Sequence, residues 1–517
     1  MVNKAIFKSY FGKLIAGTNT VNHAGAPAYA LTAREALAQY AVTGTFNDTF
    51  HANAGEQLDA VVKLAAEVEP EFLAKVAIYA AEKGHMKDMP VMLLAMLSAL
   101  ESDAFARAFP KVVKSGKMLR GFVQVMRSGA TGRKSLGTRP KKMVQAWFET
   151  RTVDQILHAM VGNDPSLPDV IKMVHPKPKD EARAALYAWA IGKPYDVAAL
   201  PAEVMAFEAF KRDTALPLPN VPFQMLTSLG LSREQWAEIA LKSSWQMARQ
   251  NLNTFARNHV FEVDGVAEKL AVRLADPEAV RKARVFPYQL MVAWQMVDPS
   301  VPTVVKDALQ DAMETAISAV PTVYGNVVVC PDVSGSMSSP VTGHRKGATT
   351  VVRCIDVAAL VAASFLRRNR NTRVLPFENN VVHVDLNGRD SVMTNAAKLA
   401  AVGGGGTNCS APLHLLVKEK AKVDLVVFVS DNQSWIDAAG QGQTTAMMDQ
   451  WAQIKRLNPA AKLVCLDIQP YVQTPATGAD ILNIGGFSDA VYGAIESFAA
   501  GKSDAGEWVR TIETIDL

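Results

Sequence analysis

Apolar residues recur at helical spacing almost throughout the chain from about residue 32 to residue 319. Leu58 and Val61 lie three positions apart, and Phe72 and Val76 lie four apart, as on one face of a helix. Gly and Pro divide the pattern into elements of roughly 10 to 16 residues with short connections. Stacked helix pairs of this kind are typical of an α-solenoid, although no motif of fixed period repeats. Short β-rich segments are not visible in this half.

The pattern changes after Pro321, where apolar strand-like runs begin to alternate with helical stretches. This alternation predicts a doubly wound, largely parallel sheet. We therefore expect two domains, a helical-repeat domain over residues 1–320 and an α/β domain over residues 321–517. The predicted strands are 327–329, 372–377, 381–386, 424–430 and 462–468, and the predicted helices are 356–367, 391–401, 444–457 and 489–499.

A polar turn follows the first of these strands. Asp332, Ser334 and Ser336 alternate along it, so that a carboxylate and two hydroxyls lie on one side of the backbone. Oxygen donors of this kind suit a hard divalent cation that keeps water in its remaining positions. A motif this short also fits an ordinary polar turn without a metal.

Two further oxygen donors are predicted at the same edge of the sheet. Four glycines at 403–406 form a flexible loop that can bring the Thr407 hydroxyl close to another strand. Asp431 directly follows an apolar strand, at the carboxyl end where ligands bind in such sheets. With only two carboxylates among five donors, the set favours Mg²⁺ over other divalent cations, with an open position for a partner's carboxylate or phosphate oxygen. A loop cluster without an ion is the alternative.

The charge of the chain is unevenly distributed, although its net value is only +4. Residues 104–148 contain no acidic residue. A basic stretch of this kind is typical of nucleic-acid binding, where affinity comes from the release of counterions. A solvated helix face balanced by acids elsewhere is the alternative. The eleven basic residues in the stretch are Arg107, Lys111, Lys114, Lys117, Arg120, Arg127, Arg133, Lys134, Arg139, Lys141 and Lys142.

Composition narrows the class of protein. Apolar residues make up 49% of the 517 positions, which is ample for globular cores. The N-terminal stretch lacks the residue order of a signal peptide, and no apolar run is long enough to span a membrane. The four cysteines are far apart and form no Cys-x-x-Cys pair. These features predict a reduced, cytoplasmic protein.

The five donors resemble the metal-ion-dependent adhesion site of von Willebrand factor A domains, in which Asp332, Ser334, Ser336, Thr407 and Asp431 match the ligands. Helical repeats followed by such a domain resemble the Ro autoantigen family, which joins a TROVE module to an A domain. The similarity covers essentially the whole chain. Further matching segments are Asn22–Gly25, Tyr40–Phe46, Ala81–Pro90, Gly116–Arg120, Arg127–Gly129, Gly404–Ser410 and Ser430–Asn432.

This resemblance implies a ring-like α-solenoid of HEAT-like repeats, closed by a Rossmann-like A domain and monomeric. It also implies a non-catalytic ribonucleoprotein component that acts in RNA quality control and processing. Small Y-type RNA would bind the basic outer surface, and single-stranded ends of misfolded RNA would enter a central hole. Lys141, Lys142 and His175 match the family's Y-RNA contacts, whereas Leu167 stands where the family has another His. The residues we expect to contact RNA are Lys111, Lys114, Lys117, Arg120, Arg127, Arg133, Lys134, Arg139, Lys141, Lys142 and His175.

Two rival functions compete with RNA binding. The A domain could act as an adhesion or scaffolding module that grips a partner's carboxylate through Mg²⁺, for example to recruit an exoribonuclease to bound RNA. A hydrolase finds little support, because His344 and His414 lack a recognisable orienting carboxylate and no Ser-His-Asp order is visible.

Overall fold

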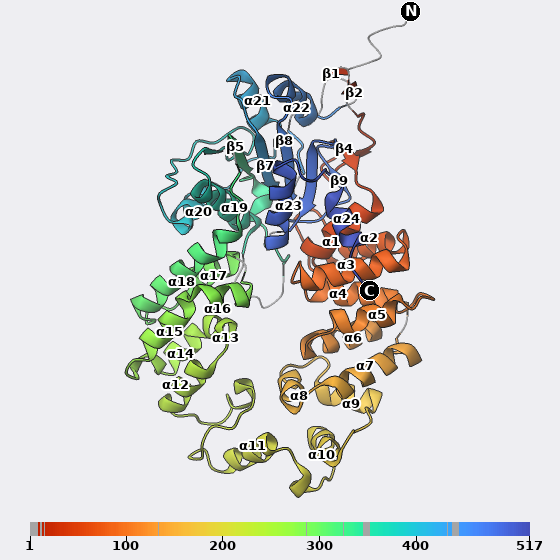
Figure 1. Cartoon of the computed structure of the whole chain (residues 1–517), viewed down its shortest axis with the longest axis vertical. Helices are drawn as coiled ribbons and strands as arrows, with labels where there is room; N and C mark the ends of the chain where they lie inside the picture. The colour runs from red at the N-terminus through yellow and green to blue at the C-terminus, as the bar shows by residue number, and fades with distance from the viewer. Residues whose placement is uncertain are drawn as a thin grey trace, which may run out of the picture.

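The helices of this chain follow a ring-shaped path, and an α/β domain lies where the two ends of the path meet (Figure 1). The computed structural model describes residues 9–10, 13–14, 16–132, 134–285, 287–323, 325–344, 352–431, 433–436, 444–486 and 488–517. In this description the ring-like solenoid and the doubly wound domain predicted from the sequence are both confirmed.

Several helices of the first part begin directly after a residue whose side chain caps the N-terminus of the helix. Thr32, Asn53 and Ser166 each accept a hydrogen bond from the N–H three residues on, which starts a helix at the following residue. The helices are α1 (Ala33–Thr43), α2 (Ala54–Ala66), α3 (Pro70–Glu82), α4 (Asp88–Leu97), α5 (Ala104–Val112), α6 (Gly116–Ser128), α7 (Thr138–Thr150), α8 (Val153–Ala159), α9 (Leu167–Val174), α10 (Glu181–Ala190), α11 (Ala202–Arg212), α12 (Arg233–Lys242), α13 (Trp245–Gln250), α14 (Leu252–Arg257), α15 (Val266–Ala275), α16 (Pro277–Ala283), α17 (Pro287–Met296) and α18 (Thr303–Ala316), with 3₁₀ turns at Val197–Ala199, Phe223–Met225, Val260–Glu262 and Ile317–Ala319.

The α/β domain is built on a parallel sheet. In the described residues it has five strands in the order β10-β8-β7-β5-β6. Its strands are β5 (Val327–Pro331), β6 (Thr372–Val374), β7 (Leu425–Ser430), β8 (Lys462–Asp467) and β10 (Ile481–Gly485), and its helices are α19 (Cys354–Arg368), α20 (Val392–Ala400), α21 (Ala411–Lys418), α22 (Ala446–Leu457), α23 (Asp489–Ala499) and α24 (Glu507–Glu513), with a 3₁₀ turn at Gly335–Ser338.

Both faces of the sheet are buried, which explains why its strands read as continuous apolar runs. Val327 and Val329 point into the large core that includes α19. Val328 and Cys330 point to the opposite face, where α21 and α22 pack. Alternate side chains of β5 therefore pack into two different cores, one on each face of the sheet.

Several elements differ from the sequence-based expectation. The strand expected at 372–377 ends at Val374, and residues 381–386 form no strand beyond an isolated bridge between Phe377 and Val381. β10, α21 and α24 were not predicted. The first half also contains strands, contrary to expectation: β1 (Ser9–Tyr10) with β2 (Lys13–Leu14), and β3 (Thr20–Val21) with β4 (Pro27–Ala30).

Contacts between distant parts of the sequence close the ring. β4 pairs with β9 (Gln473–Thr474) of the α/β domain, and α24 packs on α3. On the other arm, α17 contacts α19. The four cysteines are buried and unpaired. Within the part of the chain that the structure describes, no helix is long and apolar enough to cross a membrane.

Candidate functional site

The predicted metal donors meet at the carboxyl edge of the sheet, between neighbouring strands β5 and β7. Asp332 directly follows β5, and its N–H donates to the carbonyl of Val429 in β7 at 3.0 Å. Asp431 directly follows β7. After β5 the chain adds β6 on one side of this strand and then β7, β8 and β10 on its other side. The strand order therefore reverses between β5 and β7, and both carboxylates lie at this topological switch point.

Three hydroxyls complete the constellation. The Ser334 and Ser336 Oγ atoms are 3.3 Å apart, and the Thr407 hydroxyl donates to Ser334 Oγ at 3.0 Å. Neighbouring oxygens around an octahedral Mg²⁺ are separated by about 3.0 Å, given metal–oxygen distances near 2.1 Å. The hydroxyl spacing therefore fits the cation that the sequence predicts.

The glycine loop brings Thr407 to this position, as its composition suggested. Gly405 has φ +74°, a conformation that glycine adopts without strain. Its carbonyl accepts a hydrogen bond from the Gly335 N–H at 3.0 Å, which ties the loop to the serine turn. A Cβ at Gly405 would lie 1.5 Å from a carboxylate oxygen of Glu378, so no larger residue fits without a shift.

Asp332 is completely buried and its two oxygens already accept hydrogen bonds. The Ser334 N–H donates to Oδ1 at 2.9 Å, and the Ser430 hydroxyl donates to Oδ2 at 2.6 Å. Burial, and then the neighbouring negative charge of Asp431, raise the pKa of the Asp332 carboxyl. A divalent cation between the two carboxylates would offset this repulsion.

The helical part of the chain covers the site, which the sequence did not reveal. His51 Nε2 lies 3.5 Å from Asp431 Oδ2, is buried, and finds no hydrogen-bond partner among the described residues. The His23 N–H donates to Gln433 Oε1 at 3.0 Å, two residues beyond Asp431. Burial and the neighbouring His51 lower the pKa of the His23 ring. No pattern in the sequence links residues 22–51 to Asp431, because tertiary packing alone brings them together.

A further buried carboxyl, Asp467 at the end of β8, lies at the same edge of the sheet. In the described part of the chain its Oδ1 meets the criteria for no hydrogen bond; burial and the charge of Asp431 raise its pKa, and the nearby Gln39 side chain partly opposes this rise. Among the described residues, no cluster of three or more His, Cys, Asp or Glu side chains is arranged to hold a metal ion. The donor set is therefore one of hydroxyls and two carboxylates, which fits a hard cation better than zinc.

The basic stretch forms helices α5 to α7 and the loops between them. Lys117, Arg127, Lys134 and Lys142 are exposed, and no ion pair engages them within the described residues. Lys141 is half-buried. Arg133 lies outside the described residues. Helices α6 and α7, which carry three of these exposed cations, lie in one arm of the ring (Figure 1).

Other predicted RNA contacts are engaged within the protein. Arg120 is buried, and its guanidinium donates to the carbonyls of Val161 at 2.6 Å and Asn163 at 3.2 Å. This residue supports the packing of α6 and lies away from the surface. Lys114 donates to Glu82 at 2.6 Å, Lys111 to the Asp516 carbonyl at 2.9 Å, and Arg139 to the Leu100 carbonyl at 3.1 Å.

His175 is exposed at the end of α9, in a left-handed conformation with φ 52°. Leu167, which replaces the family's other His, is completely buried at the start of the same helix. Trp147 is also buried, and its indole N–H donates to the Val113 carbonyl at 3.1 Å. Of these three side chains only His175 is available to a ligand.

Comparisons with known proteins agree with this fold and site. The family model described as the Ro60 vWA domain matches residues 326–499. RNA-binding protein RO60 of Deinococcus radiodurans is 24% identical over 522 residues, covering 93% of this chain and 95% of that protein. RNA-binding protein RO60 of Caenorhabditis elegans is 22% identical over 249 residues, covering 46% of this chain and 37% of that protein.

The crystal structure of the Deinococcus radiodurans RO (RSR) protein has the same fold, with a TM-score of 0.60 at 22% identity. It covers 91% of this chain and 100% of that one. The ring of helices, the parallel sheet and these matches confirm the resemblance found in the sequence: residues 326–499 match the model of the Ro60 vWA domain, and the chain is similar to RNA-binding protein RO60 of Deinococcus radiodurans over nearly its whole length.

Proposed function

We propose that this chain is a non-catalytic RNA-binding protein of a ribonucleoprotein. The observation that carries the proposal is an acid-free run of residues in which Lys117, Arg127, Lys134 and Lys142 stand exposed on α6, α7 and their connecting loop. Two relatives bear the name RNA-binding protein RO60, which supports the same function. Lys and Arg contacts to phosphates would give affinity with little sequence selectivity, which suits a protein that inspects aberrant RNAs.

The proposal assigns two RNA sites to the ring. Small Y-type RNA binds the exposed cations of α6 and α7, with His175 at the end of the neighbouring helix α9. Single-stranded ends of misfolded RNA enter the centre of the ring. The protein acts in the cytoplasm as a monomer, in RNA quality control and processing.

The surface site is tested by fluorescence anisotropy with a labelled stem-loop RNA at several salt concentrations. We expect Lys141→Ala with Lys142→Ala to weaken binding. The slope of log Kd against log salt should fall by about one to two units, which corresponds to the loss of one to two phosphate contacts. The control is Lys269→Ala with Lys282→Ala, which removes two exposed lysines from the opposite arm of the ring. Affinity that responds to neither salt nor the Lys141 and Lys142 substitutions would refute the proposal.

We also propose that the A domain holds Mg²⁺ and docks a protein partner, such as an exoribonuclease, through it. The convergence of Ser334, Ser336 and Thr407 hydroxyls beside two buried carboxylates supports this second function. When bound, the cation would supply an open position for a partner's carboxylate oxygen. Because His51 lies over Asp431, the partner would have to approach past this side chain.

A further inference from the structure

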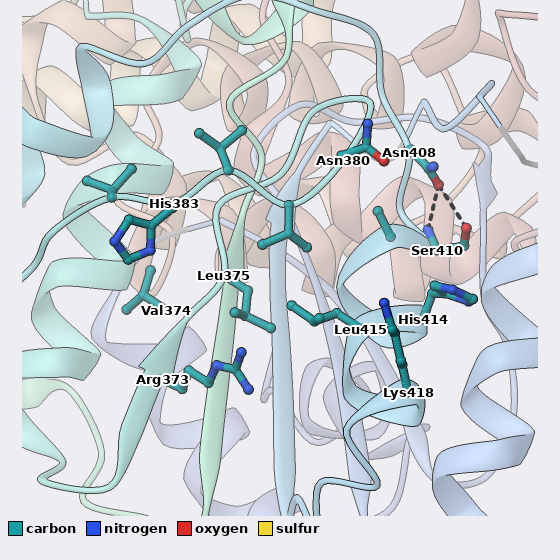
Figure 2. A pocket seen from close by; sticks show the side chains of 14 residues that line it. Arg373, Val374, Leu375, Asn380, His383, Asn408, Ser410, His414, Leu415 and Lys418 are labelled. Atoms are coloured by element: carbon teal, nitrogen blue, oxygen red, sulfur yellow. Dashed lines mark hydrogen bonds between the residues drawn. The ribbon is translucent and has the colours of Figure 1, made fainter.

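A groove on the outer side of the A domain belongs to neither proposed site. It lies between edge strand β6, the segment 380–384 and helix α21, and its volume is about 790 Å³ (Figure 2). A volume of this size is in the range of ligand sites in proteins. Its lining residues are Arg373, Val374, Leu375, Asn380, Val381, Val382, His383, Val384, Asn408, Ser410, Ala411, His414, Leu415 and Lys418.

One wall of the groove is the unpaired edge of the sheet. β6 is the last strand in the order, and in the described residues it pairs only with β5. The Leu375 N–H donates to the Val329 carbonyl of β5 at 2.9 Å. Because backbone groups alternate in direction along a strand, the N–H and C=O of Val374 face the groove. Such an edge is a template for another extended chain.

The opposite wall leaves room for that chain. The Val382 N–H donates to the Pro376 carbonyl at 2.8 Å, which holds this segment to the sheet at one end. Beyond this bond no strand continues, yet Val384 still lines the groove together with Val374. The segment thus runs beside β6 without pairing along it. The outward backbone groups of Val374 are therefore left without a backbone partner among the described residues, as at edge strands to which a peptide adds a further strand.

The groove is basic. Arg373, His383, His414 and Lys418 line it, and no Asp or Glu does. His414 and Lys418 are one helical turn apart on the exposed face of α21 and make no ion pair within the described residues. Arg373 pairs with Glu419, which lies outside the lining. An acidic ligand would therefore meet the Lys418 ammonium, which makes no ion pair among the described residues, together with the two imidazoles.

The apolar part of the lining favours a peptide over RNA. Figure 2 shows Leu375 and Leu415 between Arg373 on the strand side and Lys418 on the helix side. The lining contains no Phe, Tyr or Trp, whereas sites for single-stranded RNA commonly stack bases on aromatic rings. Valine and leucine side chains instead suit the alternate side chains of an added strand.

We propose that this groove binds an extended, acidic segment of a protein partner. The segment pairs its backbone with Val374 at the free edge of β6. Its carboxylates lie against His414 and Lys418 of α21, and its apolar side chains lie on Leu375 and Leu415. This docking site is separate from the metal site and from the RNA surface, so its test is independent of both.

The test begins with selection of a phage-displayed library of random 12-residue peptides on the full-length protein. We expect the enriched peptides to alternate apolar and acidic residues. A synthetic peptide of an enriched sequence should then lose at least tenfold in affinity for His414→Ala with Lys418→Glu, measured by fluorescence anisotropy. Val374→Pro should cause a similar loss, because it removes the outward N–H and proline is tolerated at a strand edge.

Lys502→Glu is the matched control, since it reverses an exposed charge outside the groove and should leave affinity unchanged. Enrichment of peptides without an acidic excess would overturn the proposal, as would equal binding to wild type and both groove variants. The proposal would also be overturned if the library yielded no peptide that binds the wild type more tightly than the Val374→Pro variant. If a labelled oligouridylate loses affinity for the His414→Ala, Lys418→Glu variant while the peptide does not, the groove is an RNA site instead.

Discussion

The Asp332 carboxyl is buried beside Asp431, and the two negative charges repel each other. Substitution of Asp332 therefore tests directly whether a cation lies between them. A cation present at 100 times its dissociation constant would add about 2.7 kcal/mol to the free energy of unfolding. We expect Mg²⁺ to raise the Tm of the wild type, EDTA to lower it, and Asp332→Ala to abolish both responses in calorimetry. RNA binding should remain largely intact.

Asp390→Ala is a suitable control for this experiment, because Asp390 pairs with Lys398 at the surface of the same domain. Its Tm should still respond to Mg²⁺. A wild-type Tm that is indifferent to both Mg²⁺ and EDTA would contradict the metal site.

Arg120 and Arg127 lie on the same helix and separate a packing role from a surface role. Arg120→Ala would remove the two hydrogen bonds that this buried guanidinium donates to the carbonyls of Val161 and Asn163, which should lower the free energy of unfolding by about 2 kcal/mol. Arg127 is exposed, so its removal should change this free energy by less than about 0.5 kcal/mol. Urea denaturation of both variants measures the difference, and equal losses would contradict these assignments.

The convergence of the five oxygen-bearing side chains could be predicted because each follows a strand or a glycine loop in a recognisable order. Ser430 and His51 could not. Ser430 is simply the last residue of an apolar strand, and only the structure shows its hydroxyl on Asp332. His51 reaches Asp431 from the helical part, across 380 positions of sequence. The sequence also could not show which basic side chains are buried. Arg120 is buried and Lys117 is exposed, although both lie in the same basic stretch.

At the scale of elements, strands buried on both faces were predictable and edge segments were not. β7 and β8 each contain a continuous apolar run and were expected within a residue or two of their observed ends. Residues 381–386 also alternate, yet they lack a neighbour that pairs along their length. β4 has four residues, and its partner β9 lies more than 400 positions away. A strand of that length carries too little pattern to detect.

The proposed metal site depends on the glycine loop at 403–406, which positions Thr407. We expect Gly405→Ala to lose most of the Mg²⁺-dependent rise in Tm, because its Cβ would collide with Glu378 and displace Thr407. Gly403→Asn is the control, since nothing lies near a Cβ there and Asn tolerates its φ of +43°. If both variants kept the full response to Mg²⁺, the loop geometry would not be needed for the site.

At the scale of the whole molecule, the domain boundary predicted at residue 320 marks a change in sequence pattern, but elements from both sides of this boundary pack against each other. The first strands and helices contact the A domain through β4, and the C-terminal helix α24 returns to α3. A ring of this kind has no free arm, so each contact supports the closure made by the others. The sequence could indicate two kinds of structure but not which elements join them, because those contacts are made by short elements that are far apart in the sequence.

Trp508 provides the test of this closure. It is buried between α24 and α3, where its indole N–H donates to the Tyr79 hydroxyl at 3.0 Å. Truncation of a buried Trp costs about 3 kcal/mol or more, so Trp508→Ala should release α24 locally and speed proteolysis of residues 500–506 by about 100-fold. Trp435, 53% exposed, is the control, and Trp435→Ala should leave the rate unchanged. Equal rates for wild type and Trp508→Ala would mean that β4 and α17 hold the ring closed without help from α24.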